Sequence, residues 1–288
     1  MKNITVVLKH SALENYSGRE IRKHRQLNPA LFATMQAAHD DHQRSIEQLT
    51  GLLSESGISW HVIDRDDVRT TLDRSPLIIT LGGDGTFIHA SHFITKSLLL
   101  GVNSAPLYSI GHYCAHDVLS EKSKRRLLRT LENYFNIGTA AIQTQELLRM
   151  QLEVSGRVLN TLILNDLLFA ESNPAAMTRY TLSYRKQRED QKSSGVWICT
   201  PSGSSAAYAS AGGKVFARKE IRFIVRELYN RKGKSTRQGV IKAGESLEII
   251  SLMHSGRLYL DGSHNIRPIV LGDHIIIRAH NEMLRVVG

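Results

Sequence analysis

Residues 77–86 read Leu-Ile-Ile-Thr-Leu-Gly-Gly-Asp-Gly-Thr, and the rest of the chain is organised around this stretch. A short apolar run of strand length ends in two glycines, Asp84, a third glycine and Thr86. The apolar residues that follow have helical spacing, which predicts a helix over 86–97. The glycines therefore lie where a buried strand turns into a helix, at the carboxyl edge of a sheet.

This glycine turn (residues 82–86) has the chemistry of a phosphate site. Its glycines let another group approach the backbone closely and permit positive φ. The N-terminus of the following helix offers free N–H groups and a partial positive charge. Asp84 would repel a phosphate unless it holds a proton, a metal ion or a hydroxyl, so it is a candidate base for phosphoryl transfer to an alcohol. Gly-Asp-Gly is also common turn chemistry, and an Asp84 that only caps the turn is the alternative.

The composition is that of an ordinary globular protein. A length of 288 residues predicts two domains, each able to bury a core. No apolar run approaches the length that spans a bilayer, and we see no secretory or transit segment after Met1. Cys114 and Cys199 are far apart in sequence, which rules out a disulfide framework and indicates a reducing compartment. We therefore expect a cytoplasmic protein that does not contact a membrane.

The net charge of +10 favours polyanions, either nucleic acid or phosphorylated small molecules. The charge is uneven, because nine Lys/Arg and two Glu lie between Lys214 and Arg237. A solvated surface is the more common meaning of such a run. The alternative is an electrostatic field around a phosphate-rich substrate.

The first half of the chain alternates strands and helices. This order predicts a parallel, doubly wound sheet that binds ligands at the carboxyl ends of its strands. From about Thr144 short strands separated by turns predominate. We therefore expect an α/β domain over 1–140 and a mostly β domain over 141–288. The expected strands are 4–8, 60–63, 77–81, 98–102, 147–154, 157–169, 179–184, 196–199, 247–253, 257–260 and 274–278, and the expected helices are 30–56, 86–97 and 121–135.

Polar clusters fall at three further places. Residues 101–104 (Gly-Val-Asn-Ser) follow an expected strand. Asn165 and Asp166 lie inside an apolar strand, where burying both side chains costs several kcal/mol unless they are hydrogen-bonded. They are either a turn pair at a strand bend or a pair that reads the polar edge of a ligand. Small residues over 200–213 would let a helix approach a ligand or another backbone closely.

The combination of these motifs resembles the NAD kinase family. The glycine turn alone is shared with diacylglycerol and sphingosine kinases and, with Ser for Thr, with phosphofructokinases. Residues 200–213 read Thr-Pro-Ser-Gly-Ser-Ser-Ala-Ala-Tyr-Ala-Ser-Ala-Gly-Gly. They are similar to the family's Thr-Pro-x-Gly-Ser-Thr-Ala-Tyr-x-x-Ser-Ala-Gly-Gly signature, at the right distance after Asn165-Asp166. Asp261-Gly262 resembles the family's late Asp-Gly, so the resemblance spans Val6 to about Gly262.

Within the family the chain resembles most the mitochondrial-type enzymes and their bacterial relatives. That resemblance does not place the protein in mitochondria. The pointers are Val7–Lys9, Gly101–Ser104 with Gly111–Cys114, Lys192–Gly195, and Arg226-Glu227.

The resemblance implies a kinase fold of the NAD kinase/diacylglycerol kinase type, and transfer of the γ-phosphoryl group of ATP to the 2′-hydroxyl of the adenosine ribose of NAD(H). Asp84 would accept the hydroxyl proton. Mg²⁺ is expected with ATP, because phosphoryl transfer needs positioning and charge neutralisation. The family usually forms homodimers or homotetramers through the β domain. In the implied site Gly83, Gly85 and Thr86 lie against phosphates, Asn165 and Asp166 hold the dinucleotide, Ser205, Ala206 and Ser210 line the adenine pocket, Asp261 stands near the reacting centre or its metal, and Asn103, His112 and Tyr208 complete the nucleotide-binding set.

Three departures from the family pattern concern the nicotinamide half of the substrate. Ala207 occupies the position of the family's Tyr, and Tyr208 follows one position later. Ser194 replaces an Asp that often contacts substrate across a subunit interface. Residues 110–113 read Ile-Gly-His-Tyr in place of Leu-Gly-Phe-Leu. The preference between NAD and NADH therefore stays open.

Two rival functions are kept. A lipid kinase shares the glycine turn and two-domain plan, but the 200–213 signature argues against it. A dinucleotide sensor or nucleic-acid-binding protein is permitted by the basic stretch, but has no need of Asp84, and nucleic acid is not expected as a partner. His112 and His116 have zinc-like spacing, yet no third ligand is obvious, so no metal site is assigned to protein residues.

Overall fold

The computed structural model describes residues 2–229 and 235–288 and divides into two compact units. Unit 1 comprises Met1–Glu146 and Leu284–Gly288, and unit 2 comprises Leu147–Met283. The boundary thus follows Glu146 rather than residue 140, and the final residues return to unit 1. Part of the basic stretch 214–237 falls at 230–234, outside the described residues.

Unit 1 is built on one six-stranded sheet in the order β2-β1-β3-β4-β18-β5. The pairs β1–β2, β1–β3 and β3–β4 are parallel, as the alternating sequence predicts, and the unforeseen pair β4–β18 is parallel too. Strand β18 follows unit 2 in the chain and is inserted between β4 and β5. The strands are β1 (Asn3–Leu8), β2 (Ser59–Asp64), β3 (Leu77–Gly82), β4 (Leu98–Asn103), β5 (Thr144–Leu147) and β18 (Leu284–Val287).

The helices of unit 1 begin and end at sequence signals. Ser17 and Glu20 form a capping box at the start of α1, and the Asn28 side chain caps α2. Gly57, at φ +70°, follows the end of α2, as expected. Helix α3 starts at Asp84 and ends at Ser91, so it is shorter than the expected 86–97. The helical segments are η1 (Leu13–Asn15), α1 (Gly18–Leu27), α2 (Pro29–Glu55), η2 (Arg65–Asp67), α3 (Asp84–Ser91), α4 (Glu121–Asn136) and η3 (Thr139–Ala141).

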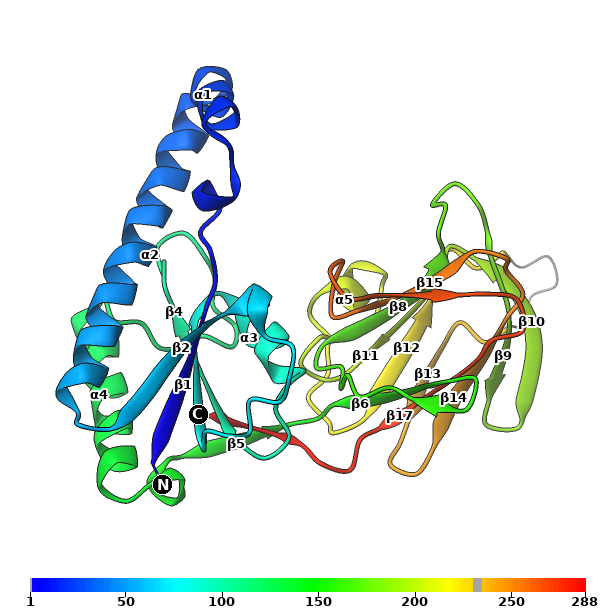
Figure 1. Cartoon of the computed structure of the whole chain (residues 1–288). Coiled ribbons are helices and arrows are strands. Elements are labelled where there is room, and N and C mark those ends of the chain that lie inside the picture. The colour runs from blue at the N-terminus through cyan, green and yellow to red at the C-terminus, as the bar shows by residue number, and fades with distance from the viewer. Residues whose placement is uncertain (1, 230–234) are drawn as a thin grey trace. The chain divides into compact units, whose positions relative to one another are not determined.

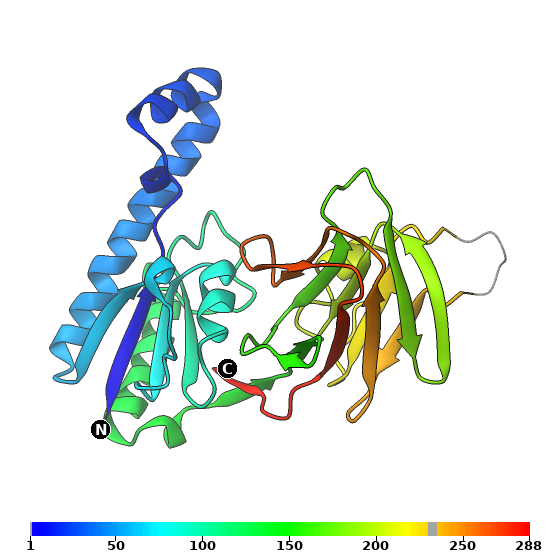
Figure 2. The same cartoon turned by 45° about the vertical axis from the view of Figure 1, so that its right-hand side comes forward.

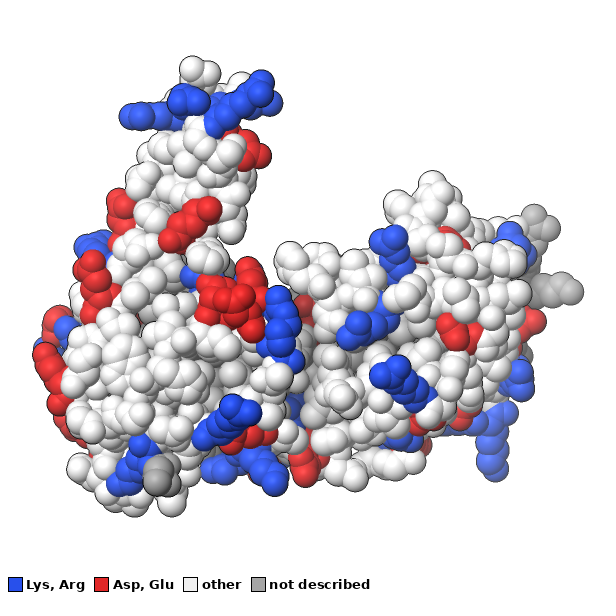
Figure 3. All heavy atoms as spheres, in the orientation of Figure 1, with Lys and Arg blue, Asp and Glu red and all other residues white. Residues whose placement is uncertain are grey.

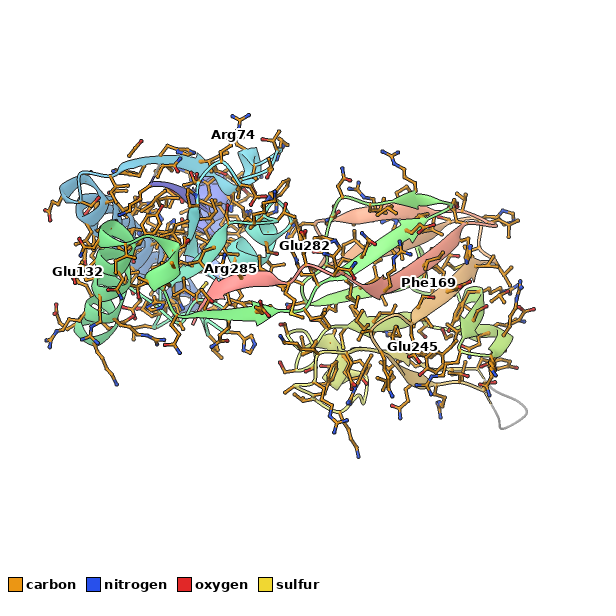
Figure 4. The ribbon with its side chains drawn as sticks, turned by 90° about the horizontal axis from the view of Figure 1, so that it is seen from below. Arg74, Glu132, Phe169, Glu245, Glu282 and Arg285 are labelled. Carbon is orange, nitrogen blue, oxygen red and sulfur yellow. The ribbon has the colours of Figure 1, made fainter. Side chains whose placement is uncertain are left out.

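Helices α2 and α4 lie on one side of the sheet and α3 on the other (Figures 1 and 2). Leu49 and Leu53 of α2 and Leu127 and Leu131 of α4 join the apolar side chains of the strands in one core. Glu132 lies on the outer side of α4 (Figure 4). The helical spacing of apolar residues along α4 therefore separates a buried face from a charged one.

Helix α1 and the adjoining end of α2 extend beyond the sheet as an arm (Figures 1 and 2). Every residue of α1 is exposed or half-buried. Lys and Arg side chains gather at the tip of this arm (Figure 3), where α1 carries Arg19, Arg22, Lys23 and Arg25. This basic tip adds to the positive charge seen in the composition.

Unit 2 contains two six-stranded sheets, ordered β10-β9-β14-β17-β6-β7 and β13-β12-β11-β8-β15-β16. Their strand pairs are antiparallel, for example β8–β11 and β14–β17. Phe169, placed within unit 2 in Figure 4, shares one core with Tyr180, Leu258 and Ile277. The strands are β6 (Met150–Val154), β7 (Arg157–Val158), β8 (Asp166–Glu171), β9 (Thr178–Tyr184), β10 (Gln187–Ser193), β11 (Val196–Cys199), β12 (Ile221–Val225), β13 (Gln238–Ile241), β14 (Ser246–Ser251), β15 (Gly256–Leu260), β16 (Ile266–Ile269) and β17 (His274–Ala279).

The predicted fold class, an α/β unit followed by a mostly β unit, is confirmed. Two local expectations were wrong. The segment 157–169 is not one strand, because β7 ends at Val158 and β8 begins only at Asp166. The helix expected in 200–213 is reduced to α5 (Ala207–Ser210), one turn between loops.

Candidate active site

The glycine turn joins β3 directly to α3, as the sequence predicts. Gly82 ends β3, Gly83 precedes the first helical residue and Asp84 begins α3. Gly82 has to be glycine, because a Cβ there would lie 2.5 Å from Thr86 Oγ1. The turn therefore places the Asp84 carboxylate at the carboxyl end of the sheet, beside the start of a helix.

The loop after β4 holds the Asp84 carboxylate with its backbone. The N–H of His112 donates to Oδ2 at 2.9 Å, and the N–H of Tyr113 donates to Oδ1 at 2.8 Å. The Cys114 thiol also bonds Asp84, and burial together with the Asp84 charge raises the pKa of Cys114 to about 12. These three donors occupy three of the roughly four acceptor sites of the Asp84 carboxylate, which leaves about one site for a further donor.

Asn103 shapes the loop that holds Asp84. Its side-chain amide donates to Ser109 O at 3.1 Å and accepts from Ala105 N and from Ser109 Oγ, each at 3.0 Å. Gly111 packs against Asn103 and the Cys114 backbone, so that a Cβ on Gly111 would lie 2.5 Å from Cys114 O. The Asn103 side chain is therefore used to fix the loop, a role that the sequence did not suggest.

The ring of Tyr113 stacks on Phe87 of α3, with centroids 4.9 Å apart and planes inclined by 2°. The His112 ring meets Tyr113 edge-on at 5.1 Å. Tyr113 and Cys114 are thus members of the Asp84 site that sequence reasoning did not select. The sequence signal that could have found them is the pair of glycines at 101 and 111, because both let the backbone approach Cys114 closely.

In unit 2, Asp261 holds the backbone that leads into β8. Its carboxylate accepts hydrogen bonds from the N–H groups of Leu164, Asn165 and Asp166, at 2.8, 2.6 and 3.0 Å. Asp261 has φ +53°, in the left-handed region that few side chains adopt. The three hydrogen bonds hold the carboxylate against the Asn165–Asp166 bend.

The 200–213 signature holds the same bend from another side. Thr200 N–H donates to Asn165 O at 2.9 Å, and the Thr200 hydroxyl donates to Leu164 O. A Cβ at Gly203 would lie 2.3 Å from Asn165 O, so only glycine fits there. Two motifs far apart in sequence therefore converge on Asn165 and Asp166.

Asp166 is 8% exposed. Burial, with a smaller contribution from the Asp261 charge, raises the pKa of Asp166 to about 7. Near neutral pH this carboxyl is therefore both a hydrogen-bond acceptor and, when protonated, a donor. Such a group suits the hydroxyls of a ribose, which themselves donate and accept.

The signature's small residues and its tyrosine occupy different environments. Ser205, Ala206 and Ser210 are exposed around α5. Tyr208 is 3% exposed, and its ring packs against Phe216 with centroids 6.0 Å apart. A Cβ at Gly213 would lie 2.2 Å from the Tyr208 ring, which explains the glycine there. The Tyr208 ring thus faces the local core, and Ala207 leaves its position without a ring.

Arg222 has two partners next to Tyr208 and Phe216. It forms an ion pair with Glu220 at 2.6 Å, and its guanidinium lies 4.2 Å from the Phe216 ring centroid. Arg222 therefore makes an ion pair and a cation–π contact within unit 2. His116 is buried, and burial lowers its pKa to about 4.

The structure brings Asp84, Asn103 and His112 together in unit 1, and Asn165, Asp166 and Asp261 together in unit 2. Over residues 2–229 and 235–288, no three His, Cys, Asp or Glu side chains are grouped closely enough to hold a metal ion. Within the same residues, none of the helices has the length and apolarity that crossing a membrane requires.

No family model matches the chain. A rice (Oryza sativa subsp. japonica) protein named "Probable NADH kinase" is 30% identical over 276 residues, covering 85% of this chain and 81% of its own length. An Arabidopsis thaliana protein named NADH kinase is 29% identical over 300 residues, covering 90% of this chain and 87% of its own length. An NAD kinase of Prosthecochloris aestuarii is 24% identical over 253 residues, covering 84% and 85%.

Two solved structures share the fold. The Archaeoglobus fulgidus NAD kinase in complex with ATP has a TM-score of 0.66, 16% identity, and coverage of 99% of this chain and 93% of its own. The yeast NADH kinase complexed with NADH has a TM-score of 0.68, 16% identity, and coverage of 100% and 83%. The chain therefore has the fold of these NAD and NADH kinases.

The sequence relationship to the rice protein goes further than the fold. It joins 30% identity to coverage of most of both chains. The chain belongs to the NAD kinase family, which confirms the resemblance seen in its motifs.

Proposed function

We propose that Asp84 is the base of an NAD(H) kinase. The protein is an ATP-dependent NAD(H) kinase that transfers the γ-phosphoryl group of ATP to the 2′-hydroxyl of the adenosine ribose and makes NADP(H). The family assignment favours this activity over a lipid kinase and over a sensor without catalysis. The observation that carries the role of Asp84 is its carboxylate, fixed by two loop N–H groups at the glycine turn.

Asp84 would act by accepting the proton of the 2′-hydroxyl. The N–H groups of His112 and Tyr113 and the Cys114 thiol fix the carboxylate, and one lone-pair site remains for a hydroxyl. Gly83, Gly85 and Thr86 would border the phosphates through the backbone at the start of α3. Fixing the base in advance lowers the cost of orienting it in the transition state.

Asn165 and Asp166 would hold the acceptor dinucleotide by its ribose hydroxyls and adenine. Support comes from the converging hydrogen bonds of Asp261 and Thr200, which hold this bend in one conformation. Ser205, Ala206 and Ser210 would border the adenine, because they are exposed small residues that follow Gly203, which packs against Asn165. Ala207, which lacks a ring, leaves the preference between NAD and NADH to the assay below.

Mg²⁺ would accompany ATP, and oxygen ligands from a carboxylate and from phosphates suit this ion. The phosphate oxygens of the nucleotide would hold the ion, because Asp84 is already bonded by two N–H groups and a thiol and is assigned to the hydroxyl proton. When bound, Mg²⁺ neutralises charge on the transferring phosphoryl group.

We further propose a homodimer or homotetramer assembled through unit 2, in the cytoplasm. Exposed apolar side chains on unit 2, among them Ile266, Val270 and Leu271, support association through that unit. Two buried free thiols, Cys114 and Cys199, suit a reducing compartment.

The deciding experiment is a kinase assay with ATP as donor and NAD or NADH as acceptor, comparing the wild type with Asp84→Asn. We expect NADP(H) formation to fall at least a hundredfold, because loss of a general base costs about 10²–10⁴ in rate. Asp67→Asn, which changes an exposed aspartate of the same unit, is the matched control and should retain full activity. Activity within threefold of the wild type in Asp84→Asn would exclude Asp84 as the base, and phosphorylation of diacylglycerol in place of NAD(H) would favour the lipid kinase.

A further inference from the structure

Lys9 lies at the same edge of the sheet as the glycine turn. It directly follows β1, whose neighbour β3 ends at Gly82. The Lys9 side chain passes close to Gly82. A Cβ on Gly82 would lie 3.3 Å from Lys9 Cδ and 2.5 Å from Thr86 Oγ1. The missing side chain of Gly82 therefore lets a lysine and a threonine hydroxyl lie next to the phosphate turn.

The Lys9 ammonium has no acidic partner among the described residues. No ion pair to a carboxylate is formed by Lys9 in residues 2–229 and 235–288, although the side chain is half-buried. Burial, together with the nearby charge of Arg65, lowers the pKa of Lys9. A half-buried cation without a counter-ion is costly, and a bound anion would relieve that cost.

The groups around Lys9 come from two helical segments and a loop. Arg65 belongs to η2, and His42 of α2 bonds the Lys9 carbonyl through Nε2 at 3.0 Å. Cys114 of the loop after β4 interacts with Lys9 and also bonds Asp84. Cys114 therefore interacts with both Lys9 and the proposed base.

Thr86 gives a second, independent sign of a ligand. It is 1% exposed, and its hydroxyl has no hydrogen-bond partner within the part of the chain that the structure describes. Native proteins rarely leave a buried hydroxyl without a partner. The Thr86 hydroxyl and the Lys9 side chain border the same space next to Gly82, because a Cβ on Gly82 would lie close to both.

We propose that Lys9 binds a nucleotide phosphate oxygen at the glycine turn, with the Thr86 hydroxyl beside it. This inference rests on the proposed function for the identity of the ligand. It also answers a difficulty of the site, because Asp84 alone would repel the phosphate that the turn attracts. Lys9 supplies the positive charge that lets a carboxylate base and a phosphate lie next to each other.

The test compares dissociation constants of ATP and of NADH, each measured alone by calorimetry, for the wild type, Lys9→Met and Lys9→Arg. We expect Lys9→Met to weaken binding of one nucleotide about ten- to a hundredfold, because charged hydrogen bonds are the strong ones. The affected nucleotide identifies the source of the phosphate. Lys9→Arg, which keeps the charge, should recover most of the affinity. Lys124→Met is the control, since Lys124 is also half-buried in unit 1 but bonds Gln48.

A pH series separates charge from packing. Wild-type affinity for the affected nucleotide should fall as pH rises through the lowered pKa of Lys9, because only the ammonium binds phosphate. In Lys9→Arg the affinity should persist to higher pH, since a guanidinium stays charged. Unchanged binding of both nucleotides in Lys9→Met, or failure of Lys9→Arg to recover what Lys9→Met loses, would overturn the proposal. These measurements need no turnover, so a wild type that made no NADP(H) would refute the kinase reaction while leaving the Lys9 result standing.

Discussion

At the scale of single residues, the site depends on carboxylates with different tasks. Asp84 is fixed by two N–H groups and a thiol and keeps one lone-pair site for a hydroxyl, whereas Asp261 uses its oxygens on three backbone N–H groups. Asp166 is a buried acid at the bend that Asp261 and Thr200 hold, and burial raises its pKa to about 7. The sequence selected all three residues, but their tasks follow from hydrogen bonds that no spacing reveals.

Asp166 should make the folded protein less stable as pH rises from about 4 to 7. An acid whose pKa is raised by folding binds more protons in the folded state, so stability falls with pH between the unfolded and folded pKa values. The contribution is at most about 1.4 kcal/mol per pH unit in that window. Urea unfolding of wild type and Asp166→Asn at pH 5 and 8 measures it. We expect the mutant to gain stability relative to the wild type at the higher pH, and an equal difference at both pH values would contradict the raised pKa.

At the scale of elements, regular periodicity made the first unit readable. Strands of unbroken apolar residues and an amphipathic helix such as α4 were predicted within a few residues. Strands β10, β13 and β16 were missed because they are short or polar. Each lies at the edge of its sheet and pairs with one strand only. The bend before β8 was one of two alternatives for Asn165–Asp166, and the sequence could not select it because the bend is held by Asp261, which is far away in sequence.

The loop that holds Asp84 should depend on Asn103. Asn103→Ala removes three hydrogen bonds and leaves the loop's polar groups without those partners. We expect kcat to fall at least tenfold, because a small displacement of a catalytic group is costly. The free energy of unfolding should drop by about 1–3 kcal/mol.

Steady-state kinetics with chemical denaturation measures both effects of Asn103→Ala. Asn136→Ala, at an exposed position of α4, is the control and should change neither value. A mutant of Asn103 that loses stability yet keeps its kcat would show that the loop does not orient Asp84.

At the scale of the whole molecule, the two units are joined by two chain crossings. Unit 2 is inserted between β5 and β18, and β18 then lies between β4 and β5. Leu284 is fully buried and Val286 nearly so, so the last strand contributes to the core of unit 1. Alternating hydrophobicity did not foretell this return, because four residues carry too little periodicity to assign a strand to a distant sheet.

Removal of residues 284–288 should destabilise unit 1 specifically. Two buried apolar side chains contribute about 1.5–3 kcal/mol each, so the loss should be about 3–6 kcal/mol. Limited proteolysis should then cut near β5, which loses its neighbour in the sheet. A truncated chain with the proteolytic pattern and denaturation midpoint of the wild type would contradict this prediction.

The inserted position of β18 also governs how the protein is made. A ribosome releases β1 to β5 first and β18 only after every strand of unit 2. The nascent α/β unit therefore carries an incomplete sheet while the β unit emerges and folds, and β5 joins it only when residues 284–287 leave the exit tunnel. Synthesis order and folding order are thus opposed, and the unit translated first is the one completed last.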